Sequence, residues 1–462
     1  MNPIVAEIMK IIKDAEDSIA REEALKQYFE EFICRCVSEA LERIDVELAA
    51  EYSRNGWYVE RMDQRTVQAS YGTLTIRRRR MEKEGEKGIY PLDCELGIRK
   101  YQRYTAYLEY IISRIGAKSV YRVTAEAVNA LTPVTISHQQ VARIVKHTGI
   151  RYREWEKEQA GLEAAKSEEL RQPEVLYIEG DGLMLHGQGC KCLELHRFQI
   201  AEGIQEHKGR RELTGTHYIA EFSHKKAKEE MEEYLANHYD LSHTLVVSNS
   251  DGGAGYEKET FDEILGRTGK HEHFRDRYHV NCKCKERIGW AGRARMEAVQ
   301  KALMVHDWEK MEAALDTIRA AAQNGAQLEQ AELLKAYLKR NWPYLASMKQ
   351  RGLEKYCKII GTCESNHRLY SYRMKKQGRR WGKEGGRSMA KILTGLKNGD
   401  FREAIAAKEE FFSHEPSKPF RYAVRNALKK IKHQEHEGVR HGRIALDAPN
   451  SSAIGRLVRS IA

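Results

Sequence analysis

The chain has 462 residues, which exceeds an ordinary single domain and predicts two to four folded units. It carries 78 Lys and Arg against 67 Asp and Glu, a formal net charge of +11 that favours a polyanionic partner, with nucleic acid ahead of a membrane surface. No run approaches the roughly 20 apolar residues of a membrane-spanning helix and the N-terminus lacks signal-peptide features, so we expect a cytoplasmic protein, associated with the nucleoid when bound to DNA.

The first 53 residues predict two amphipathic helices that end near Asn55 and Gly56. Their apolar residues recur at helical spacing: Ile4, Ile8, Ile11, Ile12, Ala24, Leu25, Tyr28 and Phe32. The next segment alternates like a β-hairpin through Thr73 to Ile76 and continues into Arg77 to Arg80. Four consecutive arginines are expected to be exposed, either as a solvated face or as a phosphate-contacting edge that includes Arg77 and Arg78.

Residues 101–149 predict three short helices with the outline of a helix-turn-helix. Ser137 is a favourable N-cap for the third helix, and Gly149 is a favourable stop. Val141, Ile144 and Val145 would then pack inward. Four side chains would face the major groove of DNA: Ser137, His138, Gln139 and Arg143. A three-helix packing unit without DNA contact is the alternative.

Beyond a charged helical connector at residues 151–172, the pattern changes from helical to β-branched and apolar. Strand candidates run through YIEGDG, LELHRFQIAEGI and ELTGTHYIAEFS, and the helix KKAKEEMEEYLANHY then precedes a strand in HTLVVSNSDGG. The order is strand, strand, strand, helix, strand. This order predicts an α/β fold with a ribonuclease-H-like catalytic core.

Residues 291–356 are predicted to form an all-helical insertion, after which the core resumes near Tyr356. A basic segment follows, in which Tyr370, Tyr372 and Trp381 alternate with Lys and Arg. Aromatic rings beside cations suit single strands or distorted DNA ends, which nominates Arg379, Arg380 and Trp381 as DNA contacts. A solvated loop whose aromatic rings complete the core is the alternative. Further helices are predicted in SMAKILTGL, AIAAKEEFF and FRYAVRNALKKIK.

Two aspartates follow apolar strands at comparable places. Asp181 lies between Gly180 and Gly182, where a backbone without Cβ atoms could approach a metal or a phosphate, and Asp251 precedes a glycine cluster. In the expected sheet their strands are neighbours, so both carboxylates would share one end. Carboxylates are the ligands that hard divalent cations prefer, and two such ions assist phosphodiester cleavage.

Several segments in one order resemble the insertion-sequence DDE transposases of the ISLre-two group, whose domain has also carried an uncharacterised-protein label. The resemblance extends over essentially the whole chain: YGTLTIRRRR, YPLDCELGI, SVYRVTAEAVNAL, TISHQQVARIV, YIEGDG, SNSDGGAGYEK, FRDRYHV and CESNHRLYSYRMKKQGRRWGKEGGRSMAKI. It implies that Asp181, Asp251 and Glu364 are the catalytic, metal-binding triad. The implied cofactor is two Mg²⁺ or Mn²⁺ ions.

His279 belongs to an Asp-x-x-His element, beginning at Asp276, that looks like a signature of Mutator-like and related transposases. A supporting role in catalysis or a contact with a strand end is the functional interpretation, and a structural histidine is the alternative. Glu179, Glu257 and Glu259 are neighbouring acids. Glu179 would share a strand face with Asp181, either as a supporting group or as a solvated strand-end acid.

The predicted organisation follows these patterns: an N-terminal helical and hairpin region at 1–100, a helix-turn-helix at 101–150, a connector at 151–172, catalytic core at 173–290 and 357–400, a helical insertion at 291–356 and a C-terminal helical region at 401–462. The predicted function is a transposase that binds terminal inverted repeats and target DNA, and the resemblance implies a homodimer or higher homo-oligomer. A non-catalytic DNA-binding protein and a nuclease without strand transfer are the alternatives.

Nine cysteines without a signal peptide predict reduced thiols. Six of them form three Cys-x-Cys pairs: Cys34 and Cys36, Cys190 and Cys192, and Cys282 and Cys284. The spacing of a second zinc-binding pair is missing, so small buried side chains are favoured over metal ligands.

Overall fold

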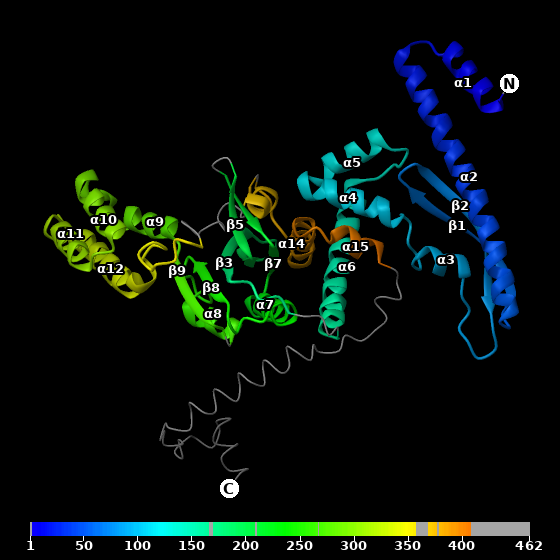
Figure 1. Cartoon of the computed structure of the whole chain (residues 1–462). Helices are drawn as coiled ribbons and strands as arrows, with labels where there is room; N and C mark the ends of the chain where they lie inside the picture. Colours follow the sequence, from blue (N-terminus) through cyan, green and yellow to red (C-terminus); the bar gives the residue numbers. More distant parts are fainter. Residues whose placement is uncertain are drawn as a thin grey trace, which may run out of the picture.

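The computed structural model describes residues 2–165, 170–207, 210–266, 268–356, 368–376 and 378–407 (Figure 1). Its N-terminal region consists of α1 (Pro3–Asp14), α2 (Ser18–Arg54), β1 (Tyr58–Ala69), β2 (Gly72–Glu82) and α3 (Pro91–Leu96). The Asp17 carboxylate caps α2 by accepting from two backbone N–H groups. The two predicted helices and the hairpin are therefore confirmed.

The predicted exposure of four consecutive arginines is wrong. β2 continues through them, and strand alternation makes Arg77 exposed and Arg78 buried. Arg78 lies 2.7 Å from a carboxylate oxygen of Asp93 and 3.7 Å from the centre of the Tyr90 ring. Arg79 pairs with the buried Asp45 at 2.6 Å. Compensating carboxylates on α2 and α3 make this partial burial possible.

The three predicted helices are present as α4 (Ala106–Lys118), α5 (Tyr121–Leu131) and α6 (His138–Ala165). The Ser137 hydroxyl accepts from the Gln140 N–H at 3.3 Å, as an N-cap should, and the three apolar residues expected to pack inward are buried. The predicted stop at Gly149 is wrong, because α6 runs on through much of the predicted connector to Ala165.

Gly149 permits close packing between α6 and α14 (Lys383–Asn398). A Cβ atom on Gly149 would lie 2.5 Å from the Cα atom and 2.6 Å from the carbonyl oxygen of Ser388. These are backbone atoms and cannot rotate away. The glycine is therefore required by the neighbouring helix rather than by a helix end.

Gly149→Ala is expected to destabilise the protein by about 1–3 kcal/mol, since the added methyl group forces the two helices apart. Gly→Ala within a helix otherwise stabilises by roughly 0.5–1 kcal/mol. Gly385→Ala on α14, where no atom lies within 4 Å of the added Cβ, is the matched control and should be neutral or stabilising. Urea unfolding of both variants checks the prediction, and equal behaviour of the two would contradict it.

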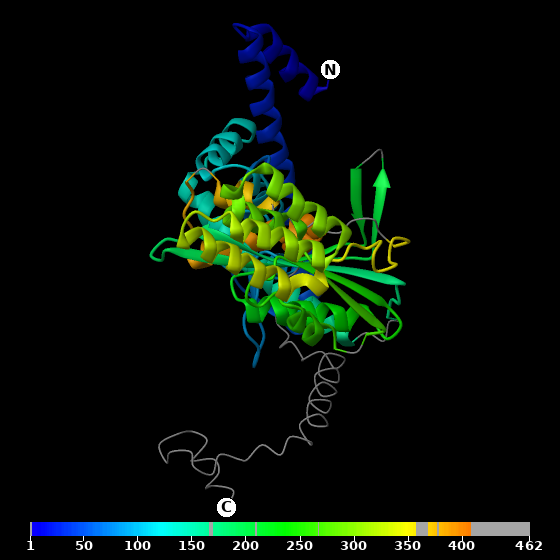
Figure 2. The ribbon, with the colours of Figure 1, turned by 90° about the vertical axis from the view of Figure 1, so that its left-hand side faces the viewer.

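The centre of the fold is a mixed five-stranded sheet in the order β7-β4-β3-β8-β9. Its strands are β3 (Val175–His186), β4 (Cys192–Ala201), β7 (His217–Glu221), β8 (Leu245–Ser250) and β9 (Lys270–Arg275). β4 is antiparallel to both β3 and β7, whereas β3, β8 and β9 are mutually parallel. The predicted α/β class is confirmed. A hairpin of β5 (Gly203–His207) and β6 (Arg210–Thr214) projects from the sheet (Figure 2).

Helices cover both faces of the sheet. On one face, α7 (His224–His238) and α8 (Lys258–Leu265) bury Ile178, Phe198 and Ile200. On the other face, α6, α14 and α15 (Phe401–Ala406) share a core with Leu183, Leu185 and Leu195. The three-helix unit therefore packs into the same core as the sheet.

The helices predicted for residues 291–356 are present. They are α10 (Arg293–Val305), α11 (Trp308–Ala320) and α12 (Gly325–Asn341), which form their own core with α9 (Arg277–Ile288), with short 3-10 turns at Gly289–Ala291 and Trp342–Tyr344. The helix predicted in SMAKILTGL lies within α14, and a π-helical turn covers Ser371–Lys375. Residues 408–462, with the last predicted helix, lie outside the described residues. Within the described part of the chain, no helix is long and apolar enough to cross a membrane.

Candidate functional site

Asp181 and Asp251 lie at equivalent positions on neighbouring parallel strands. In the β3–β8 pairing the last matched residues are Gly180 and Ser250, and each is followed directly by one of the aspartates. Asp181 is buried, whereas Asp251 begins the loop that leaves β8 and is partly exposed. The expectation that the two aspartates lie side by side is confirmed, but Asp181 does not end its strand, because β3 continues to His186.

A band of buried polar side chains surrounds Asp181 on its face of the sheet. Along β3 this face passes from Tyr177, in an apolar cluster with Met348 and Leu353, through Glu179 and Asp181, and then to Leu183 in the core below α14. The neighbouring strands continue the band with Arg197, Gln199 and Asn249, all buried.

Burying polar groups between two apolar clusters costs free energy even when the groups find partners. A protein retains such a band mainly where the polar groups serve a function, which makes this band the best candidate for a functional surface. Glu179 is only 4% exposed, so the interpretation of it as a solvated strand-end acid is wrong.

The two glycines beside Asp181 provide room for side chains. A Cβ atom on Gly180 would lie 2.9 Å from ring atoms of both Phe198 and Tyr256. A Cβ atom on Gly182 would lie 2.4 Å from the Glu194 carboxylate. These glycines were expected to admit a metal or a phosphate. Protein side chains occupy that space instead, on the face of the sheet opposite to Asp181.

The loop after Asp251 is held in one conformation. A carboxylate oxygen of Asp251 accepts from the Gly253 N–H at 2.8 Å, and Glu257 accepts from the Gly255 N–H at 2.8 Å. Gly252 has a φ of +77° and packs directly against the guanidinium of Arg275, so a side chain is excluded there. Arg275 is buried and donates to the Ser250 hydroxyl at 3.2 Å. A fixed cation therefore supports the loop that presents Asp251.

His279 lies in the electrostatic field of both aspartates. Asp276 caps α9 by accepting from the Tyr278 N–H at 3.0 Å, and its second oxygen accepts from His279 at 2.8 Å. This hydrogen bond, with further contributions from the charges of Asp276, Asp181 and Asp251, raises the pKa of His279 to about 8 despite partial burial. The ring is therefore mainly an imidazolium at neutral pH.

The His279 pKa provides a test of this arrangement. Asp276→Asn should lower it most, and Asp181→Asn or Asp251→Asn should lower it less, because each removes a charge that favours the imidazolium. NMR titration of the imidazole resonances, with His279→Gln to assign the signal, measures the pKa. The raised value also means that the contribution of His279 to stability is fully present below about pH 6.5 and disappears as the pH rises through about 8. An unchanged midpoint in all three variants would contradict the geometry.

Several groups close to the aspartates have no signal in the sequence. His196 and Tyr256 share a hydrogen bond of 3.0 Å, and the His224 ring lies 5.2 Å from the His196 ring. Burial, together with the charges of Glu194, Asp181 and Asp251, raises the pKa of Tyr256. These residues come from β4, α7 and the loop after β8. No fixed spacing in the chain could have identified them.

Glu364 lies outside the described residues, but the described residues on both sides of it are close to the polar band. The carbonyl of Tyr356 accepts from the Tyr177 hydroxyl at 3.0 Å, and the guanidinium of Arg197 lies 4.6 Å from the centre of the Tyr370 ring. In the described part of the chain, no group of three or more His, Cys, Asp or Glu side chains is arranged to hold a metal ion. Two members of the expected triad are therefore placed.

The predicted DNA contacts differ in exposure. Ser137, His138, Gln139 and Arg143 are all exposed along the start of α6, and Arg380 is exposed as well.

Trp381 is 7% exposed and donates its indole N–H to the Met374 carbonyl at 2.8 Å, while Arg379 donates to the Arg373 carbonyl. Tyr370 is also buried, whereas Tyr372 is exposed. For Trp381 and Tyr370, the interpretation that aromatic rings complete the core is correct.

The described cysteines carry free thiols, but they are not mainly buried. Cys36, Cys190, Cys192 and Cys282 are exposed, Cys34 is intermediate and only Cys284 of the three Cys-x-Cys pairs is buried. Burial raises the pKa of the Cys284 thiol to about 12. The expectation of small buried side chains is therefore wrong for most of these residues.

Comparison of the amino-acid sequence with known proteins places the chain in one family. Residues 18–410 match the model of an uncharacterised protein family, UPF0236. A Streptococcus gallolyticus protein, named "UPF0236 protein in vanSb 3'region", is 33% identical over 461 residues, which cover 99% of this chain and 100% of the relative. A Caldanaerobacter subterraneus UPF0236 protein, whose name joins eleven locus designations, is 22% identical over 467 residues, or 99% of this chain and 91% of the relative. The chain therefore belongs to the uncharacterised protein family UPF0236.

Proposed function

We propose that this protein is a DDE transposase with a ribonuclease-H-like catalytic core. The sheet topology supports the core: three consecutive antiparallel strands are followed by two parallel strands, in the order 3-2-1-4-5 along the sheet. A helix, α7, connects the third strand to the fourth. The helical block after the fifth strand corresponds to the insertion that similar transposases carry.

The observation that carries the proposal is the placement of Asp181 and Asp251 directly after paired residues of two parallel strands. Ligands of α/β sheets gather at the carboxyl ends of parallel strands, and here Asp251 follows the end of β8 with Asp181 beside it on β3. After the Asp276 hydrogen bond for His279 and burial for Tyr256, the charges of both aspartates contribute to the raised pKa values of these two groups.

These carboxylates suit divalent cations, because oxygen ligands with negative charge are preferred by Mg²⁺ and Mn²⁺. Asp181 and Asp251 would hold the ions, with Glu364 as the proposed third ligand. Bound ions would supply an activated oxygen nucleophile and stabilise charge on the scissile phosphate.

The other residues of the site would bind and orient DNA. The imidazolium of His279 provides a positive charge beside the two acids and is suited to a phosphate oxygen of the cleaved strand. The Arg275 guanidinium stabilises the loop that carries Asp251, through a hydrogen bond to Ser250 and packing against Gly252. The exposed start of α6, with Ser137, His138 and Arg143, suits recognition of the terminal repeats in the major groove.

The family comparison adds circumstantial support. A relative whose name joins eleven locus designations is expected for a genetic element that multiplies within one genome. A formal net charge of +11 suits a protein that holds DNA. The resemblance to transposases further implies a homodimer or higher homo-oligomer that brings two DNA ends together.

A strand-transfer assay tests the proposal. Labelled DNA carrying the repeats that flank the gene is incubated with a supercoiled target plasmid, the full chain, and either Mg²⁺, Mn²⁺ or a chelator. Joined products with either metal, and none with the chelator, are expected. Cleavage without joining would replace the proposal by a nuclease, and metal-independent binding without cleavage under any condition would replace it by a non-catalytic DNA-binding protein.

A further inference from the structure

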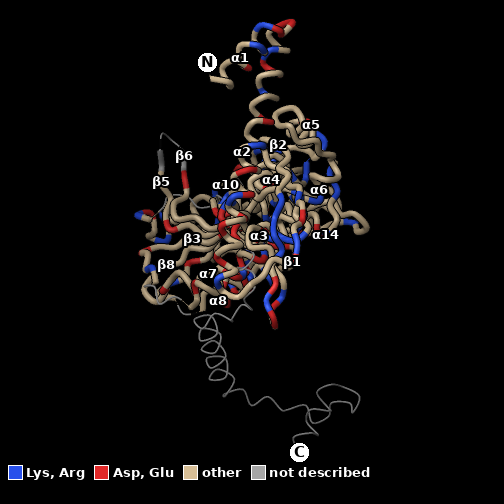
Figure 3. The backbone as a smooth tube through the Cα atoms, turned by 90° about the vertical axis from the view of Figure 1, so that its right-hand side faces the viewer, with Lys and Arg blue, Asp and Glu red and all other residues tan. Residues whose placement is uncertain are grey.

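A second, strongly basic site lies in the N-terminal region, well separated from the sheet (Figure 1). It is a cleft of about 1100 Å³ between the β1–β2 hairpin and the segment from Lys87 to Arg103. Seven of its lining residues are Lys or Arg, and one, Asp93, is acidic. Figure 3 shows Lys and Arg concentrated along the β1–β2 hairpin beside α3. The proposed catalytic function makes no use of this cleft.

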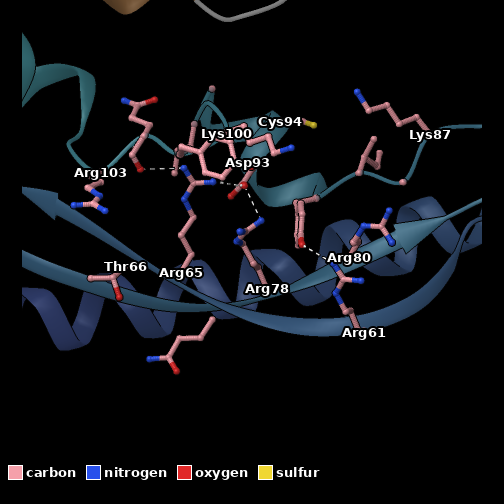
Figure 4. Close-up of a pocket in the computed structure, with 18 residues that line it drawn as sticks. Arg61, Arg65, Thr66, Arg78, Arg80, Lys87, Asp93, Cys94, Lys100 and Arg103 are labelled. Atoms are coloured by element: carbon pink, nitrogen blue, oxygen red, sulfur yellow. Dashed lines mark hydrogen bonds and ion pairs between the residues drawn. The ribbon is translucent and has the colours of Figure 1, made fainter. Parts of the chain in front are cut away.

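The cations of the cleft fall into two groups. Those of the hairpin are paired: Arg65 and Arg78 both reach Asp93 at 2.7 Å, Arg61 reaches Asp63 at 2.9 Å, and Arg80 pairs with Glu60 and Glu82. Figure 4 shows Arg65 and Arg78 pointing from the strands toward Asp93. These pairs build the floor of the cleft.

The second group lies on the opposite wall and consists of Lys87, Lys100 and Arg103. All three side chains are exposed, and none of them takes part in the ion pairs formed within the described residues. Exposed cations around a preformed cleft attract a polyanion, because their charge is not neutralised by protein carboxylates.

The Tyr101 ring, between Lys100 and Arg103 in the chain, is exposed to solvent. Tyr101 is 84% exposed and has a φ of +64°, which a tyrosine rarely adopts. The backbone around Tyr101 is stabilised by Arg65, whose guanidinium donates to the carbonyls of Arg99 at 2.5 Å and Gln102 at 3.1 Å. The Lys100 ammonium lies 5.0 Å from the centre of the Tyr101 ring.

A positive φ at a tyrosine that is maintained by a partly buried ion-pair network indicates a functional constraint, and a ring that is 84% exposed has no role in the core.

We infer that this cleft binds an unpaired nucleotide of DNA, with its base stacked on Tyr101 and its flanking phosphates against Lys87, Lys100 and Arg103. Phosphates explain the three unpaired cations, and an exposed base offers the flat face that an isolated tyrosine ring can stack on. A base within an intact duplex has no free face. The cleft is therefore suited to a single-stranded tail or gap next to a duplex, the form that DNA takes at a cleaved end. This inference shares with the proposed function only the assumption that DNA is the partner.

Binding is measured with the full chain carrying Asp181→Asn, in a chelator, so that no DNA is cut. Fluorescently labelled hairpin duplexes with and without a ten-nucleotide tail are titrated across several salt concentrations. Tyr101→Asn removes the ring and keeps a residue that tolerates positive φ, and Tyr101→Trp keeps an aromatic face. The charge variant combines Lys87→Gln, Lys100→Gln and Arg103→Gln. Its matched control removes the same charges from the exposed insertion surface: Lys301→Gln, Lys339→Gln and Arg340→Gln.

Tyr101→Asn is expected to weaken binding of tailed DNA by roughly tenfold and blunt DNA much less, while Tyr101→Trp binds like the parent. The charge variant should reduce the slope of log affinity against log salt by about 2 for the tailed DNA, since roughly 0.7 is lost per phosphate contact on a single strand. The control triple variant should keep the parental slope.

Equal losses for tailed and blunt DNA, equal effects of the two triple variants, or no binding of tailed DNA by the parent would overturn the inference. Strand transfer by the wild-type chain is scored separately, so a failure of the cleft and a failure of the transposase proposal give different results.

Discussion

Asp181→Asn and Asp251→Asn are each expected to reduce strand transfer by about 10²–10⁴-fold while leaving affinity for the terminal repeats unchanged. Asn keeps the size of the side chain and removes the charge that holds a divalent ion, which contributes several kcal/mol to the transition state. The two aspartates follow paired residues of β3 and β8 and so lie side by side, and the two losses should be similar. Glu364→Gln should behave in the same way if it is the third ligand. The measurements are joined product per unit time in Mg²⁺ and gel-shift affinity in a chelator.

Glu259→Gln is the matched control, because this carboxylate lies in the same region after β8 but is exposed on α8. It should transfer strands at the wild-type rate. Full activity of Asp181→Asn or Asp251→Asn would show that other groups carry the chemistry. Loss of DNA binding together with activity would instead indicate that the acids have a structural role.

Lys391→Met is expected to destabilise the protein by about 3–5 kcal/mol, the largest stability effect that the structure predicts. The Lys391 side chain is fully buried and its ammonium lies 2.8 Å from Glu156, 3.4 Å from Glu221 and 2.8 Å from Glu230. Burial opposes the charged form, but the three carboxylates outweigh it and raise the pKa of Lys391. The substitution leaves the buried Glu221 on β7 and the partly buried Glu156 on α6 and Glu230 on α7 without their shared cation. Urea unfolding measures the loss.

Lys383→Met, at the exposed start of the same helix, removes the same charge and should change stability by less than about 0.5 kcal/mol. Adding Glu230→Gln to Lys391→Met should recover part of the loss, because one uncompensated carboxylate disappears. The deficit of Lys391→Met should also shrink as the pH falls, since protonation neutralises the remaining acids. A deficit that is unaffected by both changes would mean that lost packing, and not charge, is responsible.

Features that depend on neighbouring residues in the chain were predicted well. Helical spacing and capping side chains located α1, α2, α5 and the start of α6, and β-branched runs located β3 and β8. The proximity of Asp181 and Asp251 also followed from the sequence, once the expected sheet order made their two apolar strands parallel neighbours. The helices and strands needed only periodicity, whereas the pairing of the aspartates also needed the expected order of strands in the sheet.

Predictions that depended on the identity of a distant neighbour were wrong. Gly149 looked like a helix stop, but the partner that requires a glycine is Ser388 on α14. Arg78 was expected to be exposed, yet it pairs with Asp93, and Trp381 completes the core, which was the alternative to an exposed DNA contact. In each case the residue type was compatible with two environments, and only the contact across the fold distinguished them.

The amino-acid sequence alone was sufficient for many of the helices and strands, because hydrogen-bonded periodicity and capping act over a few residues, but β9, α8, α9 and the β5–β6 hairpin were not predicted. The tertiary structure decided the rest: the buried polar band around Asp181, the support of Asp251 by Arg275, the raised pKa of His279 and the display of Tyr101 by Arg65. These features depend on burial and on charges brought together from distant parts of the chain. Both are properties of packing that no local pattern of residues encodes.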